Sequence, residues 1–298
     1  MKKFAKLSAL VLALTLVLGV FAGCGGKGSG NDNSKKVSDV GAKVVDIPLS
    51  EEQYAFCINK SDKELLEKAN AYLAKIKEDG TFNAICDKYF ADGTPAQFVS
   101  AVKDASKDQL IVATSTGFEP FEMVENDKFS GIDIEIAAGF AKYLGKELVI
   151  EDMKFESVVT SVGQGLCDIG MAGLTITPAR QAVVSFSDSY YSANQMLIVP
   201  GDNTEFDNCK TAEDVAKILN EKTSATKIGC QNGTTGGVYI DGDADDPDGY
   251  GFPGLKATKM AFDYAALAIT AMKNGEIDYV IVDDAPAKAI VKAMNGGK

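Results

Sequence analysis

The chain has 298 residues, with 42 acidic and 30 basic side chains and a formal net charge of −12. This charge argues against nucleic acid as a partner, because neutralising phosphates needs clustered cations. Histidine is absent, which removes the usual general base, histidine-dependent triads and histidine-type zinc sites. We therefore expect no metal, no cofactor and no catalytic residue.

The N-terminus has the pattern of a secretion signal. Three lysines precede an apolar run at residues 7–20, which is too short to span a bilayer comfortably. Small residues then lead into Cys24, as at a lipoprotein processing site. We predict a lipoprotein signal peptide at 1–23, lipidation of Cys24 at the outer face of the cell membrane, and a flexible tether at 24–42. The alternative is an ordinary signal peptide with an incidental cysteine.

A compact stretch follows the tether. Its pattern predicts strands at 43–47 and 54–58 and a helix that begins at Ser61. Ser61 and Glu64 have the spacing of a capping box, and apolar residues then recur every three or four positions. A second short helix is expected at 82–90. Residues 94–108 are weakly patterned and indicate a connector.

The rest of the chain alternates strands with helices. We expect strands at 110–113, 147–150, 168–172, 195–199, 227–230 and 277–282, and helices at 133–144, 157–165, 211–220, 263–273 and 285–294. The helix at 133–144 is expected to place four residues on one face: Ile136, Phe140, Tyr143 and Leu144. Alternation of this kind predicts mostly parallel sheets with helices on both faces. The length favours two lobes.

The cysteines and an acidic loop carry little functional signal. Five cysteines besides Cys24 show no CxxC spacing, so we interpret them as buried free thiols. A bridge between Cys209 and Cys230 is the alternative.

The segment 241–249 has the acidic spacing of a calcium loop but lacks its glycine and closing glutamate, so we interpret it as a solvated loop.

Arg180 is the only arginine in the chain. A planar guanidinium can grip a carboxylate through two parallel hydrogen bonds, which lysine cannot do. Thr177 and Pro178 have the pattern of a helix cap and first helical position, which would place Arg180 in the first turn of a helix. We infer an anion site, with a structural salt bridge as the alternative.

Three further features fit the same site. The glycine-rich segment 233–237 follows a predicted strand and exposes backbone N–H groups, although it also fits a plain turn. Asp283 ends a predicted strand, where a carboxylate can pair with an ammonium group or cap a helix. Phe118 and Phe155 follow two other strands and fit either an apolar sandwich or the core. Together these features describe a site for a zwitterion.

At this point the sequence resembles the family 3 extracellular solute-binding proteins of polar amino acid importers. The matching motifs are GIDIEI (131–136), GFEPFE (117–122), DIGMAGLTITPAR (168–180), FSDSYY (186–191), IGCQNGTTG (228–236) and IDYVIVDD (277–284). Phe140 departs from the signature, where a smaller aliphatic residue is usual. In the family, a segment like 44–90 comes last in the chain, whereas here it comes first. The sequence therefore resembles a circularly permuted member, joined through 94–108.

The resemblance implies a set of roles in ligand binding. Arg180, Thr175 and the backbone N–H groups of Thr175 and Thr235 would hold the α-carboxylate, and Asp283 with the Gly173 carbonyl would hold the α-ammonium. Phe118 and Phe155 would flank the side chain. The full set of expected ligand-binding residues is Ser115, Phe118, Phe155, Gly173, Thr175, Arg180, Gln231, Thr234, Thr235 and Asp283, with Glu119 as a further contact. Ser115 stands where relatives for cationic ligands, and for glutamine, often have aspartate; the missing aspartate argues against a lysine or arginine ligand, and we expect a neutral or polar amino acid.

These expectations combine into one hypothesis. The fold would be a permuted, two-lobed α/β fold of the type II periplasmic-binding-protein kind, with lobe one at 51–191 and lobe two at 43–50 and 192–298. A free amino acid would bind by hinge closure, and the monomeric protein would deliver it to the permease subunits of an ABC importer. The alternatives are a sensor module for the same amino acid and a dehydratase-like enzyme on the same fold.

Overall fold

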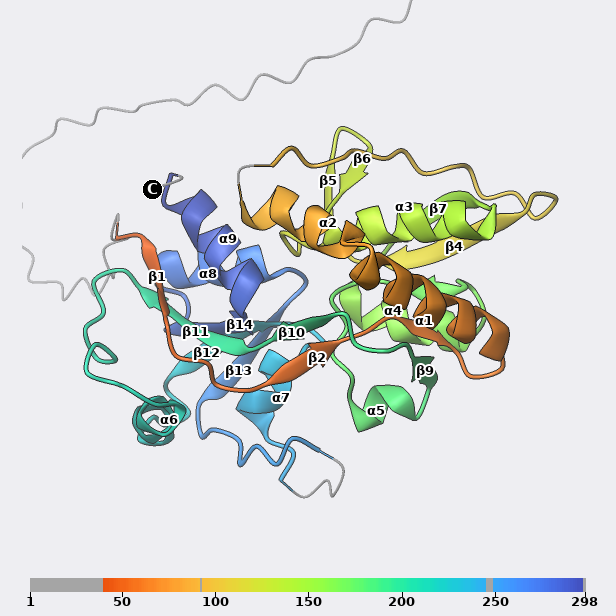
Figure 1. Cartoon of the computed structure of the whole chain (residues 1–298). Coiled ribbons are helices and arrows are strands. Elements are labelled where there is room, and N and C mark those ends of the chain that lie inside the picture. The colour runs from red at the N-terminus through yellow and green to blue at the C-terminus, as the bar shows by residue number, and fades with distance from the viewer. Residues whose placement is uncertain (1–39, 92, 245–248, 297–298) are drawn as a thin grey trace, which may run out of the picture. The chain divides into compact units, whose positions relative to one another are not determined.

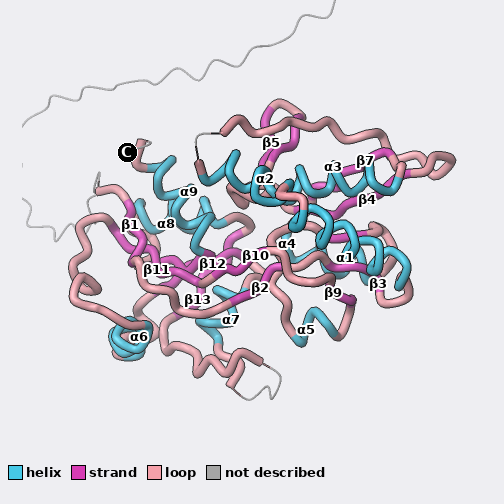
Figure 2. The backbone as a smooth tube through the Cα atoms, viewed as in Figure 1, coloured by secondary structure: helices cyan, strands magenta, loops and turns pink. Residues whose placement is uncertain are grey.

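The computed structural model describes residues 40–91, 93–244 and 249–296. The predicted signal peptide and Cys24 lie outside this part, as does most of the predicted tether. Residues Val37–Lys298 form one compact unit, which contains two five-stranded sheets (Figures 1 and 2). Among the described residues, no helix has the length and hydrophobicity needed to cross a membrane.

The first sheet is built around β4. In spatial order its strands are β7 (Glu147–Asp152), β4 (Gln109–Thr114), β8 (Ile169–Gly170), β3 (Cys57–Asn59) and β9 (Val184–Phe186). Only β3 runs against its neighbours, so the expectation of a mostly parallel sheet is confirmed. Its helices are α1 (Lys63–Glu78), α2 (Thr81–Phe90), α3 (Ile132–Leu144) and α4 (Phe155–Gly163).

The second sheet repeats this arrangement. In spatial order its strands are β13 (Thr258–Phe262), β12 (Lys227–Gln231), β14 (Tyr279–Asp283), β11 (Gln195–Pro200) and β1 (Ala42–Val45). Again a single strand, β11, is antiparallel to both neighbours. The helices are α6 (Ala212–Asn220), α7 (Thr235–Asp241), α8 (Ala265–Lys273) and α9 (Asp284–Met294).

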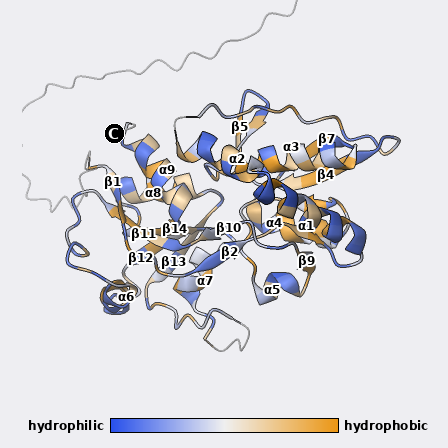
Figure 3. Ribbon diagram, in the orientation of Figure 1, coloured by the Kyte–Doolittle hydropathy of each residue, from blue (hydrophilic) through white to orange (hydrophobic). Residues whose placement is uncertain are grey.

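Each sheet is covered on both faces, because its strand residues alternate between two apolar clusters. In β4, Val112 packs in the cluster beneath α1, α2 and α3, whereas Ala113 packs in the cluster beneath α4. In β11, Ile198 packs beneath α8 and α9, and Leu197 packs beneath α6 and α7. Figure 3 shows the result: β4 is hydrophobic, whereas the outer helices α1 and α6 are largely hydrophilic.

The chain passes between the two sheets twice, at one place. Strands β2 (Glu52–Tyr54) and β10 (Tyr191–Ala193) form a two-stranded antiparallel ribbon. β2 leads from β1 to β3, and β10 leads from β9 to β11. We call this pair the crossing ribbon. It overlaps the two hinge crossings that the sequence predicts near 50–53 and 192–195; the lobe boundaries themselves stay a prediction.

Several local predictions need correction. Asp62 rather than Ser61 caps α1, since its side chain accepts from Leu65 N, and Ser61 instead donates to the Asn59 side chain. The strand expected at 54–58 is split into β2 and β3. Tyr143 is 48% exposed, although its ring still packs against Tyr72.

Other elements carry weak local signals and were missed. They are the hairpin β5 (Met123–Glu125) and β6 (Lys128–Ser130), the strands β9, β10 and β13, and the helix α7. The glycine-rich segment 233–237 is not a plain turn, because its second half forms the first turn of α7. All five described cysteines are free, so Cys209 and Cys230 do not form the alternative bridge.

Candidate functional site

Hydrogen bonds link several of the ten predicted ligand-binding residues, and some of these links join the loops of the two sheets. The ten residues come from the ends of β12 and β14, from the loops after β4 and β8, and from the starts of α4 and α7, together with the short helix α5 (Pro178–Gln181). Arg180 is half-buried and the other nine residues are buried. The carboxyl ends of parallel strands are the usual ligand-binding edge of such sheets.

Arg180 links the loops of both sheets. Thr177 caps α5 by accepting from Arg180 N at 3.2 Å, with Pro178 at the first helical position, as predicted. The Arg180 guanidinium donates from Nη1 to Thr175 O at 2.6 Å and from Nη2 to Gly233 O at 3.0 Å. Its Cζ lies 5.2 Å from the centroid of the Phe155 ring. No ion pair of Arg180 is found within the described residues, so the salt-bridge alternative is not supported.

A glutamate that the sequence reasoning missed joins the two predicted threonines. Glu52, in β2, is 2% exposed, and its Oε2 accepts from Thr175 Oγ1 and from Thr235 Oγ1, both at 2.7 Å. Its Oε1 accepts from Ser50 Oγ at 2.9 Å. A charged residue in a short strand gave no sequence signal. Its position near a predicted hinge crossing is the one sequence feature that could have pointed to it.

Asp283 is buried at the end of β14. Gln195 Nε2 donates to Asp283 Oδ1 at 2.8 Å and to Thr235 Oγ1 at 3.0 Å. Asp283 stands at the N-cap position of α9, but its side chain makes no capping hydrogen bond. The helix-cap alternative therefore does not explain this residue. Burial, and next the nearby Glu52 carboxylate, raise the pKa of Asp283 to about 8.

Phe118 packs on Gly173. The backbone of Gly173 has φ +53°, and a Cβ there would lie 2.8 Å from Phe118 Cε1, so only glycine fits. The Gly173 N–H donates to Asp133 Oδ2 at 2.9 Å, which fixes the loop that carries its carbonyl. Phe118 and Phe155 belong to different apolar clusters. The two rings therefore lie on opposite faces of the first sheet and do not form one continuous aromatic patch.

The remaining predicted residues differ in what they can offer a ligand. Ser115 Oγ and Gln231 Oε1 are buried and have no hydrogen-bond partner in the part of the chain that the structure describes. An unpaired buried polar group costs about 1–3 kcal/mol, so both are candidate ligand contacts. Thr234 Oγ1 is already used, since it donates to Gln231 O at 2.8 Å. Glu119 lines a separate hollow with Tyr264.

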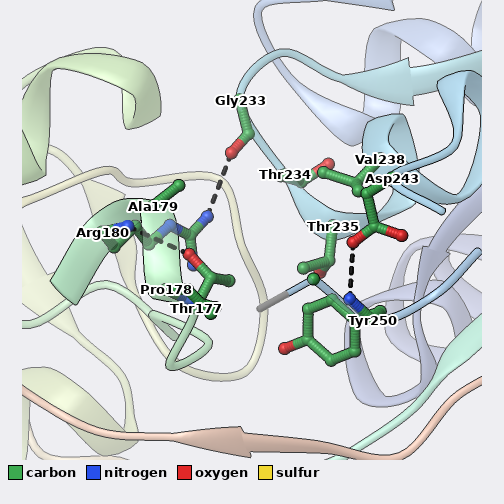
Figure 4. A pocket seen from close by; sticks show the side chains of 11 residues that line it. Thr177, Pro178, Ala179, Arg180, Gly233, Thr234, Thr235, Val238, Asp243 and Tyr250 are labelled. Carbon is green, nitrogen blue, oxygen red and sulfur yellow. Dashed lines mark hydrogen bonds between the residues drawn. The ribbon is translucent and has the colours of Figure 1, made fainter. Parts of the chain in front are cut away.

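A pocket of about 250 Å³ opens beside this group (Figure 4). Arg180, Thr234 and Thr235 line it together with Thr177, Asp243 and Tyr250; the other seven predicted residues do not. Tyr250 OH donates to Ile176 O at 3.1 Å, and Asp243 holds the Tyr250 backbone through its N–H. Part of the acidic loop is therefore tied down by Asp243, while residues 245–248 of that loop lie outside the described residues.

Residues 110–235 match the family model for bacterial extracellular solute-binding proteins, family 3. Among solved structures, an ancestral arginine-binding protein bound to arginine is 33% identical, with 63% of this chain and 75% of that chain covered and a TM-score of 0.52. The chain belongs to this family. An ancestral amino acid-binding protein, described as a precursor of cyclohexadienyl dehydratase, is 30% identical, with 62% and 74% covered and a TM-score of 0.52.

Curated members of family 3 give the same picture over shorter lengths. An arginine-binding extracellular protein of Bacillus subtilis is 39% identical over 100 residues, which are 34% of this chain and 39% of that protein. An arginine-binding ABC transporter protein of Escherichia coli is 28% identical over 182 residues, 61% of this chain and 65% of that protein. The chain thus spans less than two-thirds of the length of these relatives. Family membership confirms the two-lobed type II fold, with one sheet in each lobe.

Proposed function

We propose that this family 3 protein is the substrate-binding lipoprotein of an ABC importer, and that it binds a free, neutral or polar amino acid between its lobes. The observation that carries the proposal is the arrangement of Arg180, Thr175, Thr235 and Asp283. The anion donors are Arg180 and the backbone N–H groups of the two threonines, and Asp283 adds a buried carboxylate. The Thr175 hydroxyl, expected to help hold the ligand carboxylate, donates to Glu52 instead. An α-amino acid carries the complementary pair of charges.

Unused donors mark the carboxylate end of the site. Within the described residues, neither the Thr175 N–H nor the Thr235 N–H has a hydrogen-bond acceptor. The Arg180 guanidinium, which presents five N–H donors, makes two hydrogen bonds to carbonyl oxygens close by. A ligand carboxylate between these groups would receive charge-assisted hydrogen bonds, which are about twice as strong as neutral ones.

Asp283 and Gly173 mark the ammonium end. A cation beside Asp283 would stabilise its ionised form and offset the burial that raises its pKa to about 8. The Gly173 carbonyl belongs to a loop that Asp133 holds in place. The ligand therefore gains a charged partner on lobe two and a fixed acceptor on lobe one.

The side-chain end favours a neutral or polar ligand. Ser115 offers a hydroxyl rather than a carboxylate, and Gln231 offers an amide. One relative is named for glutamine and an ancestral arginine-binding protein has been solved with glutamine, whereas other relatives are named for arginine or histidine, so the proposal of a neutral or polar ligand rests on Ser115 and Gln231. Phe118 and Phe155 would contact the apolar part of the side chain.

We also infer that the chain is circularly permuted relative to its family, through a joint at 94–108. Residues 109–298 are 190 of the 298 residues, about the same share as the 61–63% that the relatives match. Asn295, at the end of α9, is hydrogen-bonded to Ala42 at the start of β1. Figure 1 shows β1 beside α9, as expected if the two were once joined by a loop.

Hinge closure at the crossing ribbon would bring the two lobes onto the ligand, and the closed monomer would dock on the permease. Lipidation of Cys24 would keep the protein at the outer face of the membrane. Palmitate labelling of cells tests the anchor. Label is expected in the wild-type protein and is expected to be lost in Cys24→Ser, with release of the protein from the membrane fraction.

Thermal unfolding of the purified full-length protein with each amino acid tests ligand binding. A ligand at about 1,000 times its dissociation constant adds roughly 4 kcal/mol of stability, a shift of several degrees. We expect a shift with one or a few amino acids that is lost in Arg180→Ala and kept in Lys68→Ala. Lys68 is an exposed cation on α1 and serves as the matched control. A folded protein that shifts with no amino acid would contradict the proposal.

A further inference from the structure

Glu52 is a charged side chain that is almost fully buried without a cationic partner. It is 2% exposed, and no lysine or arginine within the described residues forms an ion pair with it. Its carboxylate is satisfied by hydroxyl groups alone. A buried carboxylate is expensive unless it is paired or hydrogen-bonded, so the three hydroxyl donors are the reason that it is tolerated there.

The donors come from three different parts of the fold. Thr175 follows β8 in the first sheet, Thr235 begins α7 beside the second sheet, and Ser50 precedes the crossing ribbon. Glu52 Oε2 accepts from both threonines at once. The carboxylate can therefore make its complete set of hydrogen bonds only when the loops of the two lobes are together.

Glu52 also fixes the direction of the threonine hydroxyl groups. Because each threonine has a single O–H hydrogen, donation to Glu52 turns the lone pairs of Thr175 Oγ1 and Thr235 Oγ1 away from the carboxylate. Gln195 Nε2 then donates to Thr235 Oγ1 at 3.0 Å and to Asp283 Oδ1 at 2.8 Å. One hydrogen-bond network thus runs from the crossing ribbon to the carboxylate that would receive the ammonium group.

Glu52 does not simply occupy the place of a ligand carboxylate. It forms no ion pair with Arg180, and it leaves the N–H groups of Thr175 and Thr235 free of acceptors within the described residues. Its partners are the side chains of the same two threonines whose backbone would hold the ligand.

We propose that Glu52 is a positioning residue that couples closure of the lobes to assembly of the amino acid site. This inference rests on the proposed function. When the lobes part, Glu52 keeps at most one of its two threonine partners. The closed arrangement therefore gains a charge-assisted hydrogen bond before any ligand contact is counted, and this raises the population that is competent to bind.

Two measurements on matched variants test the proposal. Glu52→Gln keeps the shape of the side chain but removes its charge, and Glu51→Gln changes an exposed neighbour in the same segment. Small-angle X-ray scattering of the ligand-free protein is expected to show a larger radius of gyration for Glu52→Gln than for the wild type and Glu51→Gln. Calorimetric titration is expected to give a dissociation constant about 10-fold higher for Glu52→Gln, equivalent to about 1.4 kcal/mol.

A double-mutant cycle separates positioning from general stability. Thr175→Val with Thr235→Val removes both hydroxyls but keeps the shapes and the backbone N–H groups, and it provides a second variant if Glu52→Gln does not fold. We expect the threonine changes to weaken binding in the wild type and to cost little more when Glu52 is already glutamine. Additive effects would overturn the proposal, as would Glu52→Gln scattering and binding like the wild type. If no amino acid binds the wild type, the proposed function fails, whereas the scattering of the ligand-free variants still decides the role of Glu52.

Discussion

Ala42 and Asn295 stand 253 positions apart in the chain and exchange two hydrogen bonds. Ala42 N donates to Asn295 Oδ1 at 3.1 Å, and Asn295 Nδ2 donates to Ala42 O at 2.7 Å. The pair fastens the first strand of the described chain to its last helix. Chain ends that meet at a surface can be joined and reopened elsewhere without disturbing the core.

A rearranged chain tests the inferred permutation. If residues 43–93 are moved behind residue 298 through a short glycine-serine linker, and the chain then starts at Gln109, the two sheets should form as before. We expect a circular dichroism spectrum like that of the original and a dissociation constant within about 3-fold, since the binding-site residues are all kept, although the hydrogen bonds of 94–108 to Phe129, Leu148 and Ile150 are lost. A rearranged chain that is unfolded while the original folds would show that the present order is required.

Replacing Arg180 by lysine separates charge from geometry. Lysine keeps the positive charge but cannot donate to Thr175 O and Gly233 O while it grips a carboxylate. Loss of a hydrogen bond to a charged group costs about 1.5–3 kcal/mol, so the dissociation constant should rise by roughly 10- to 150-fold. Calorimetric titration measures the change. Unchanged affinity in Arg180→Lys would mean that a point charge suffices and that the forked geometry is not used.

The raised pKa of Asp283 predicts that binding releases a proton. With a pKa of about 8, caused first by burial and then by Glu52, Asp283 is mostly protonated at pH 7 in the closed, ligand-free protein. A bound ammonium group favours the ionised form, so affinity should rise by up to about 10-fold per pH unit from pH 6 towards pH 8. Titrations in buffers with different ionisation enthalpies measure the released proton. Asp283→Asn should abolish the release, and a wild type without buffer dependence would contradict this assignment.

Asp283 also makes the free energy of unfolding of the ligand-free protein depend on pH. A carboxyl whose pKa is raised on folding binds its proton more tightly in the folded state than in the unfolded state. Its contribution to the free energy of unfolding is therefore greatest below the unfolded pKa, about 3.9, and declines as pH rises through about 8. Urea unfolding across pH 5–8 should show a smaller decline in Asp283→Asn than in the wild type; some decline remains in the variant because burial raises the pKa of Asp133 to about 7.

Gly173→Ala should disturb the site more than the fold. The left-handed backbone at Gly173 would cost about 1–2 kcal/mol with a side chain, and the added Cβ would clash with Phe118 at 2.8 Å. Gly145→Ala is the matched control, because its φ is +74° and a Cβ there would meet nothing within 4 Å. Both variants should lower the unfolding temperature by a few degrees, but only Gly173→Ala should weaken ligand binding. Equal affinity in the two variants would argue against the Gly173 carbonyl as a ligand contact.

The sequence alone determined those features that local pattern and motif encode. The alternation of predicted strands with predicted helices indicated mostly parallel sheets. Thr177 and Pro178 predicted the start of α5, the short helix that carries Arg180. The six sequence motifs indicated the family of extracellular solute-binding proteins. Elements with short or weak patterns, such as β9 and β13, were missed because their residues are set by their neighbours in the sheet rather than by their own sequence.

Only the tertiary structure decided which residues of the site are joined by hydrogen bonds. Glu52 meets Thr175 across 123 positions and Thr235 across 183, and no local pattern can report hydrogen bonds over such distances. The role of Asp283 needed the same information, since its position at a helix start fits a cap until its side-chain partners are seen. A buried charge is defined by what surrounds it, and its surroundings exist only once the two sheets are folded together.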